Sequence, residues 1–107
     1  MSTNLLLVHC TFPIDGDINE FAHKLVAAKL AACVNIVPNI QSIYTWQGEV
    51  VEEKELLLLI KTSQEKFPEL ETFIKQHHPY EVVELIATPI CQIASDYKKW
   101  CLESLQN

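Results

Sequence analysis

The sequence contains no arginine: its 8 basic residues are all lysines, against 14 acidic residues, and the formal net charge is −6. Nucleic-acid binding depends on clustered basic side chains for phosphate contacts and on arginine for reading bases. The same absence removes the guanidinium clamp that holds phosphoryl groups in many transferases. The composition therefore argues against a nucleic-acid partner and against phosphoryl transfer.

Glycine and long apolar runs are also scarce. With 2 glycines the chain has no Gly-rich loop to cradle a phosphate. No uninterrupted apolar run is longer than residues 56–60, whereas a transmembrane helix needs about 20 such residues, so we expect no contact with a membrane. A chain of 107 residues with 49% hydrophobic residues is expected to form one packed domain over residues 1–107.

The 4 cysteines include no C-x-x-C pair, so a structural zinc knuckle is not predicted. The first residues lead directly into an apolar run, without the charged segment and cleavage site of a signal peptide. We therefore expect a reducing, cytoplasmic location, in which free cysteines act as small buried apolar residues.

Hydrophobic periodicity predicts four strands and three helices. A capping box at Asp17 and Glu20 opens the first helix, and a second box at Thr62 and Glu65 precedes the second helix. The predicted strands are 5–10, 34–46, 49–62 and 82–90, and the predicted helices are 18–32, a helix ending near 77–78, and a short helix from 95 onward.

This order, β-α-β-β-α-β followed by one helix, is typical of the ferredoxin-like α+β fold, an antiparallel sheet with two helices on one face. Right-handed crossovers give the strand order four, one, three, two. The last strand then lies beside the first. Cys10, at the end of the first strand, is therefore expected beside the start of the last strand, just after His77 and His78.

The long second strand bears on assembly. At about 3.3 Å per residue, residues 34–46 would span roughly 43 Å, whereas a domain of this length is about 34 Å across. Ile40, Tyr44 and Trp46 share one face of this strand, and soluble proteins normally cover such apolar edges. We therefore expect a homo-oligomer; the alternative is that the hairpin bends back over its own sheet at Pro38.

The candidate chemistry lies where the fold brings Cys10, His77 and His78 together, with Glu81 nearby. Imidazole and thiolate are ligands that copper and zinc prefer. Alternatively, His77 packs on the helix and His78 acts as a cation at the helix C-terminus. Cys10 as the nucleophile of an enzyme is a further reading, but a reactive cysteine needs an electropositive setting and this chain is acidic. We expect a protein that is not an enzyme.

Five segments in order resemble the CutA family of divalent-cation tolerance proteins. The resemblance covers nearly the whole chain and rests on these segments: Leu30-Ala31-Ala32-Cys33-Val34-Asn35, Tyr44-Thr45-Trp46-Gln47-Gly48, Ile60-Lys61-Thr62, His78-Pro79-Tyr80-Glu81 and Tyr97-Lys98-Lys99-Trp100.

The resemblance implies a homotrimer similar to the PII signalling proteins, and a role in tolerance of copper and other divalent cations. It also implies that the metal ligands are Cys10, His77 and His78. The expected function is a cytoplasmic, homotrimeric copper-binding protein that acts in metal tolerance. The alternative is a structural or signalling trimer that binds a small metabolite or a partner protein at clefts between subunits.

Overall fold

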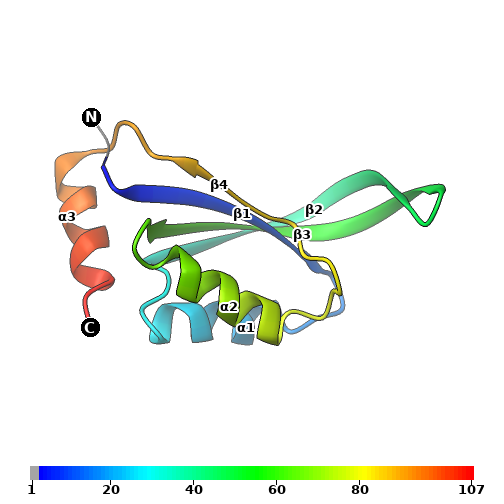
Figure 1. Cartoon of the computed structure of the whole chain (residues 1–107), viewed down its shortest axis with the longest axis horizontal. Helices are drawn as coiled ribbons and strands as arrows, with labels where there is room; N and C mark the ends of the chain where they lie inside the picture. Colours follow the sequence, from blue (N-terminus) through cyan, green and yellow to red (C-terminus); the bar gives the residue numbers. More distant parts are fainter. Residues whose placement is uncertain (1–2) are drawn as a thin grey trace.

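A computed structural model describes residues 3–107 and contains one four-stranded antiparallel sheet and three helices (Figure 1). The strands are β1 (Leu5–Pro13), β2 (Cys33–Trp46), β3 (Glu49–Ser63) and β4 (Leu85–Pro89), and the helices are α1 (Ile18–Ala27), α2 (Phe67–His77) and α3 (Ser95–Ser104). The strands lie in the order β2-β3-β1-β4. This confirms the predicted α+β, ferredoxin-like topology with an additional C-terminal helix.

Helices α1 and α2 cover one face of the sheet, and α3 lies at one end of the molecule (Figure 1). The main core lies between the sheet and these two helices, and its fully buried side chains include Val8, Leu25, Leu58, Ile60, Leu70 and Ile74. A smaller cluster of Leu5, Ala32, Cys101 and Leu105 joins α3 to the end of the sheet. Burial of these apolar side chains provides the main driving force for the fold.

The first helix begins as predicted but ends earlier. The Asp17 side chain accepts a hydrogen bond from the Glu20 amide at 3.1 Å, the first half of the predicted capping box. The helix ends at Ala27 rather than residue 32, because Lys29 adopts a left-handed backbone conformation with φ of 60°. The apolar pattern continues because Leu30 and the residues after it turn back into the core.

Two further predictions on element ends were wrong. Thr62 does not cap α2: its hydroxyl donates to the Leu30 carbonyl at 2.7 Å, and the Ser63 hydroxyl accepts from the Lys66 amide instead. The last strand covers Leu85–Pro89 rather than residues 82–90. Val82 is 69% exposed, in the connection that leads from α2 to the far side of β1 (Figure 1).

The β2–β3 hairpin extends well beyond the two helices (Figure 1), and the molecule measures 44 × 27 × 23 Å. The predicted overhang is therefore confirmed, and the hairpin does not fold back over its own sheet. Pro38 lies on the edge strand at a break in register between Val37 and Ile40, as expected for a bulge. Ile43, Trp46 and Val50 project from the overhang with 64, 44 and 74% of their surface exposed.

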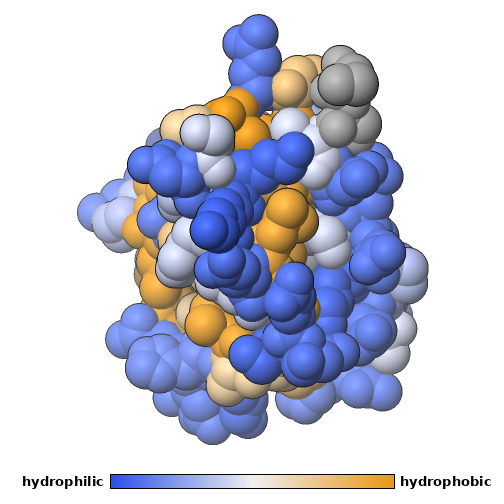
Figure 2. Space-filling model, turned by 90° about the vertical axis from the view of Figure 1, so that its left-hand side faces the viewer, coloured by the Kyte–Doolittle hydropathy of each residue, from blue (hydrophilic) through white to orange (hydrophobic). Residues whose placement is uncertain are grey.

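The second face of the sheet carries no helix (Figure 1). Successive side chains of a strand point to opposite faces of the sheet, and the fully buried residues of β1 and β3 point toward the helices. The residues between them therefore lie on the open face, and these are the half-buried Leu7, His9, Leu57 and Leu59. Hydrophobic surface also reaches solvent at the α3 end of the molecule (Figure 2). Within residues 3–107, no helix is long and apolar enough to cross a membrane.

Candidate functional site

The sheet brings the end of β1 beside the start of β4, as the sequence predicted. Cys10 pairs with Leu85, and this is the last pair of the β1–β4 ladder. The next carbonyl of β1, that of Thr11, lies beyond the ladder and needs a different donor. The imidazole of His78 fills this role, with Nε2 at 2.7 Å from the Thr11 oxygen.

The ring of His78 is buried and both of its nitrogens are engaged. The Tyr80 amide donates to Nδ1 at 3.1 Å, so Nδ1 is unprotonated and Nε2 carries the hydrogen that is donated to Thr11. The ring packs edge-on against Phe12 and Phe21, with centroids 5.0 and 6.0 Å away. Burial lowers the pKa of His78, and the bond to Thr11 and the charge of Glu55 only partly oppose this effect. His78 is therefore neutral at physiological pH.

Cys10 is also fully buried. Its thiol donates weakly to the Thr11 carbonyl at 3.6 Å, so Cys10 and His78 converge on the same oxygen atom. Burial raises the pKa of the Cys10 thiol to about 12, and the carboxylates of Glu84 and Glu55 add to the rise. The thiol is therefore protonated at neutral pH.

His77 lies at the last position of α2 and faces away from this cluster. Its ring stacks on Phe73 with centroids 4.1 Å apart, and Nδ1 lies 2.9 Å from the Phe73 carbonyl oxygen. Because a carbonyl only accepts hydrogen bonds, Nδ1 carries the hydrogen and the lone pair of Nε2 is available. His77 is exposed, so this lone pair is open to an ion from solvent.

The structure thus brings together two of the three predicted metal ligands, Cys10 and His78, while His77 is directed elsewhere. Across residues 3–107, no three or more His, Cys, Asp or Glu side chains are arranged to hold a metal ion. In this conformation Cys10 holds its proton and His78 has no free lone pair. The three residues therefore do not form a ready-made metal site within one chain.

Sequence reasoning missed the carboxylate of this region. Glu55 is only 5% exposed, and the Tyr80 hydroxyl donates to its Oε2 at 2.8 Å. The predicted acidic neighbour was Glu81, but Glu81 is exposed. Burial and the bond to Glu55 raise the pKa of Tyr80 well above its usual value, so the phenol remains a donor. One feature of the sequence could have indicated that Glu55 is buried: it lies directly before the apolar run 56–60.

Comparison with known proteins gives a consistent answer. Residues 6–104 match the family described as CutA1 divalent ion tolerance protein. The chain is 48% identical over 98 residues to the divalent-cation tolerance protein CutA of Thermus thermophilus, which covers 92% of this chain and 95% of the relative. It is 38% identical over 103 residues to the protein of that name from Yersinia pestis, covering 96% and 87%.

Solved structures agree with this result. A Thermus thermophilus divalent cation tolerance protein superposes with a TM-score of 0.91 at 46% identity, covering 95% of this chain and 99% of that one. A protein from Archaeoglobus fulgidus, described as the periplasmic divalent cation tolerance protein CutA, gives a TM-score of 0.90 at 31% identity and covers 95% and 99%. Sequence and fold therefore lead to one conclusion: the chain belongs to the CutA1 family of divalent-cation tolerance proteins.

Proposed function

We propose that this protein is a homotrimer that binds divalent cations, copper foremost, and acts in metal tolerance in the cytoplasm. The observation that carries the metal assignment is the convergence of Cys10 and His78 on the Thr11 carbonyl, directly after exposed His77. Thiol and imidazole groups favour copper over magnesium or calcium. Burial is the main cause of the raised pKa of Cys10, and Glu84 and Glu55 add to it; these two carboxylates also make the region attractive to a cation.

His77 is the first ligand in this proposal because its Nε2 lone pair is open to solvent. Cys10 joins by losing its proton. With a pKa of about 12, this loss at pH 7 costs about 7 kcal/mol at 1.36 kcal/mol per pH unit. His78 joins by giving up one of its two hydrogen bonds. Only an ion with strong affinity for sulfur and nitrogen can offset these costs, which favours copper over hard cations.

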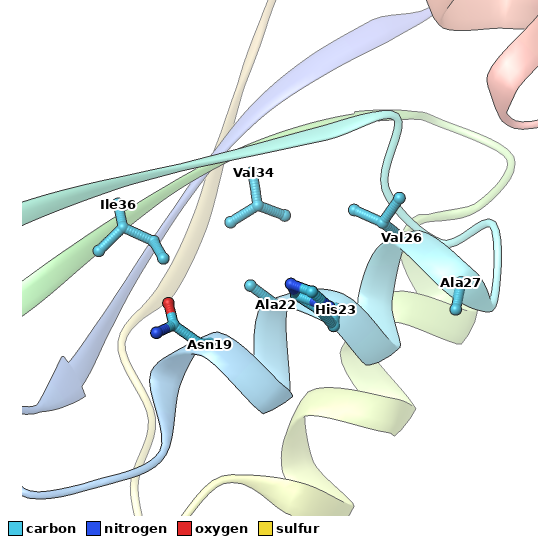
Figure 3. Close-up of a pocket in the computed structure, with 7 residues that line it drawn as sticks. All are labelled: Asn19, Ala22, His23, Val26, Ala27, Val34 and Ile36. Atoms are coloured by element: carbon cyan, nitrogen blue, oxygen red, sulfur yellow. The ribbon is translucent and has the colours of Figure 1, made fainter.

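Assembly is supported by the apolar surface that one chain leaves uncovered. The overhanging hairpin, the open face of the sheet and the edge of β2 all carry such surface. A groove of about 440 Å³ also runs between α1 and β2, and its walls include Ala22, Val26, Val34 and Ile36 (Figure 3). Further copies of the chain, arranged head to tail in a closed ring, would cover these surfaces, and the CutA1 resemblance supports three copies.

The cytoplasmic part of the proposal is supported by the cysteines. All 4 are free thiols, which is the usual state in a reducing compartment. The mass of the assembly tests the trimer: light scattering at micromolar concentration should give three times 12.2 kDa. A monomer mass under these conditions would overturn this part of the proposal.

Metal binding is tested by competition with a chromophoric Cu(I) chelator, without oxygen and with reduced protein. We expect His77→Ala and Cys10→Ser each to weaken the affinity at least tenfold, a loss of about 1.4 kcal/mol. The matched controls are His23→Ala and Cys91→Ser, because both residues are exposed and lie outside the site. Equal affinity in all four variants would refute the assignment of the ligands.

A second candidate is a trimer that binds a small metabolite or a partner protein between subunits. The saturated hydrogen bonding of His78 and the protonated state of Cys10 favour it, because neither group is ready to bind a metal in this conformation. Weak copper binding that is indifferent to Cys10→Ser, together with an intact trimer, would support this candidate over the first.

A further inference from the structure

Two other cysteines meet at the α3 end of the molecule, far along the sheet from the overhanging hairpin (Figure 1). Cys33 is the first residue of β2 and Cys101 lies on α3. Cys101 packs against Ala32, the residue directly before Cys33, in the small core cluster that joins α3 to the sheet. Tyr97, also on α3, lies near both thiols. Two thiols from distant parts of the sequence therefore lie in the same small region of the fold.

The surroundings of the two thiols differ. Cys33 is half-buried, and the Lys61 ammonium lies 3.9 Å from its sulfur. Lys61 is held in place by a second hydrogen bond, to the Asn35 side chain. The Lys61 ammonium repels metal ions, so these surroundings favour thiol chemistry over metal binding.

Cys101, by contrast, is only 1% exposed and packs with Leu5, Ala32 and Leu105. Burial raises its pKa, although the Tyr97 hydrogen bond and the Lys61 charge act in the opposite direction. A reagent in solution reaches Cys33 before it reaches Cys101. This arrangement of one accessible and one protected thiol is the one required for a first, attacking cysteine and a second, resolving cysteine.

We propose that Cys33 and Cys101 form a redox-active pair that is oxidised to an intramolecular disulfide by low-molecular-weight disulfides of the glutathione type. The Cys33 thiolate attacks one sulfur of the small disulfide, whose S–S bond breaks and releases one small thiolate that takes up a proton. Cys101 then loses its proton to solvent, attacks the Cys33 sulfur and releases the second small thiol. Overall, the protein loses two protons and two electrons, and the same two protons and two electrons convert one small disulfide into two small thiols.

The disulfide would fasten α3 to the start of the edge strand β2. Rotation of both side chains away from Tyr97 must bring the sulfurs to the bond length of about 2.05 Å. Tyr97 then loses both thiols as neighbours, so its hydroxyl reports on the reaction. The proposal concerns residues outside the metal site and is independent of metal binding.

The test is incubation of the reduced, full-length protein with glutathione disulfide and a metal chelator, followed by alkylation of the remaining thiols and peptide mapping by mass spectrometry. We expect a peptide pair linked through Cys33 and Cys101 within single chains, as shown on a non-reducing gel. Cys101→Ala should stop the reaction at a glutathione adduct on Cys33. Lys61→Gln should slow the reaction of Cys33 about fivefold at low ionic strength, with a smaller effect at high salt, because the Lys61 ammonium beside the sulfur attracts the carboxylates of glutathione disulfide.

Cys91 provides the internal control because it is exposed and lies outside this pair; Cys91→Ser should leave the Cys33–Cys101 link unchanged. The proposal is overturned if Cys91 becomes glutathionylated while Cys33 does not, or if Cys33 in the wild-type chain stops at the glutathione adduct. Should Cys101→Ala fail to fold, as judged by circular dichroism, the wild-type peptide map and Lys61→Gln still decide the outcome. Because the chelator removes metal, a negative result here leaves the proposed metal function untouched.

Discussion

Replacing His78 by alanine removes the donor that completes the end of β1. The variant loses the bond from Nε2 to the Thr11 carbonyl at 2.7 Å and the bond from the Tyr80 amide to Nδ1 at 3.1 Å. Each bond contributes about 1 kcal/mol net, and the edge-on packing against Phe12 and Phe21 adds about 1 kcal/mol. We therefore expect the free energy of unfolding to fall by about 3 kcal/mol, a large share of the 5–15 kcal/mol typical of a domain.

The same residue gives the stability a specific pH dependence. Burial lowers the pKa of His78 below its ordinary value of 6.5, so the unfolded chain binds a proton at a higher pH than the folded chain does. The stability from the neutral ring is fully present above pH 6.5, declines as the pH falls from 6.5 toward the folded pKa, and is constant below that value. The cost of His78→Ala should therefore become smaller as the solution is acidified through this window.

The measurement is urea unfolding at fixed protein concentration, in chelator, at several pH values from about 7.5 downward. His77→Ala is the matched control: this exposed ring loses one hydrogen bond and one stacking contact with Phe73, so its cost should stay below about 1 kcal/mol. A loss of less than 1 kcal/mol for His78→Ala at neutral pH, or equal costs in the two variants, would refute the structural role given to His78.

Three further predictions follow from single contacts. Tyr80→Phe removes the hydroxyl that donates to buried Glu55 and should cost about 1–3 kcal/mol in urea unfolding; a neutral result would mean that solvent already satisfies the carboxylate. Lys29→Gly should raise the free energy of unfolding by a few tenths to about 1 kcal/mol, because Lys29 has φ of 60° and glycine adopts this conformation without strain. A lower free energy of unfolding would show that the lysine side chain stabilises the fold by more than the backbone strain destabilises it. Cys10, with a pKa of about 12 and no exposed surface, should resist maleimide at neutral pH while exposed Cys91 reacts; equal labelling rates would show that the core around Cys10 opens readily.

The element order could be predicted because it depends on local periodicity, whereas the element ends depend on single contacts. The first helix ends at Ala27, and the predicted helix was too long because Leu30 and Ala31 continue its apolar spacing after the turn at Lys29. Thr62 resembled a helix cap, but its hydroxyl bonds to a carbonyl 32 residues earlier in the chain. Long-range partners of this kind cannot be deduced from spacing.

The same limit applies to the candidate site. The topology correctly brought Cys10 to the start of β4 and close to His78. The direction of each ring could not be predicted, because it depends on Phe73 for His77 and on the end of the β1–β4 ladder for His78. The burial of Glu55 could not be predicted either, because its hydrogen-bond partner Tyr80 lies 25 residues later in the chain.

The hydrogen bonds of His78 set a condition on any metal bound by both Cys10 and His78. A metal ion would have to replace the proton of Cys10, at about 7 kcal/mol, and one bond of His78, at about 1 kcal/mol. These costs together equal the binding free energy of a micromolar complex. Because the thiol releases a proton when it binds, the copper affinity should rise about tenfold per pH unit between pH 6 and 8. In the same oxygen-free Cu(I) competition assay, the copper affinity of Cys10→Ser should no longer rise with pH in this way. If the copper affinity of the wild-type chain does not vary with pH, copper is bound without Cys10.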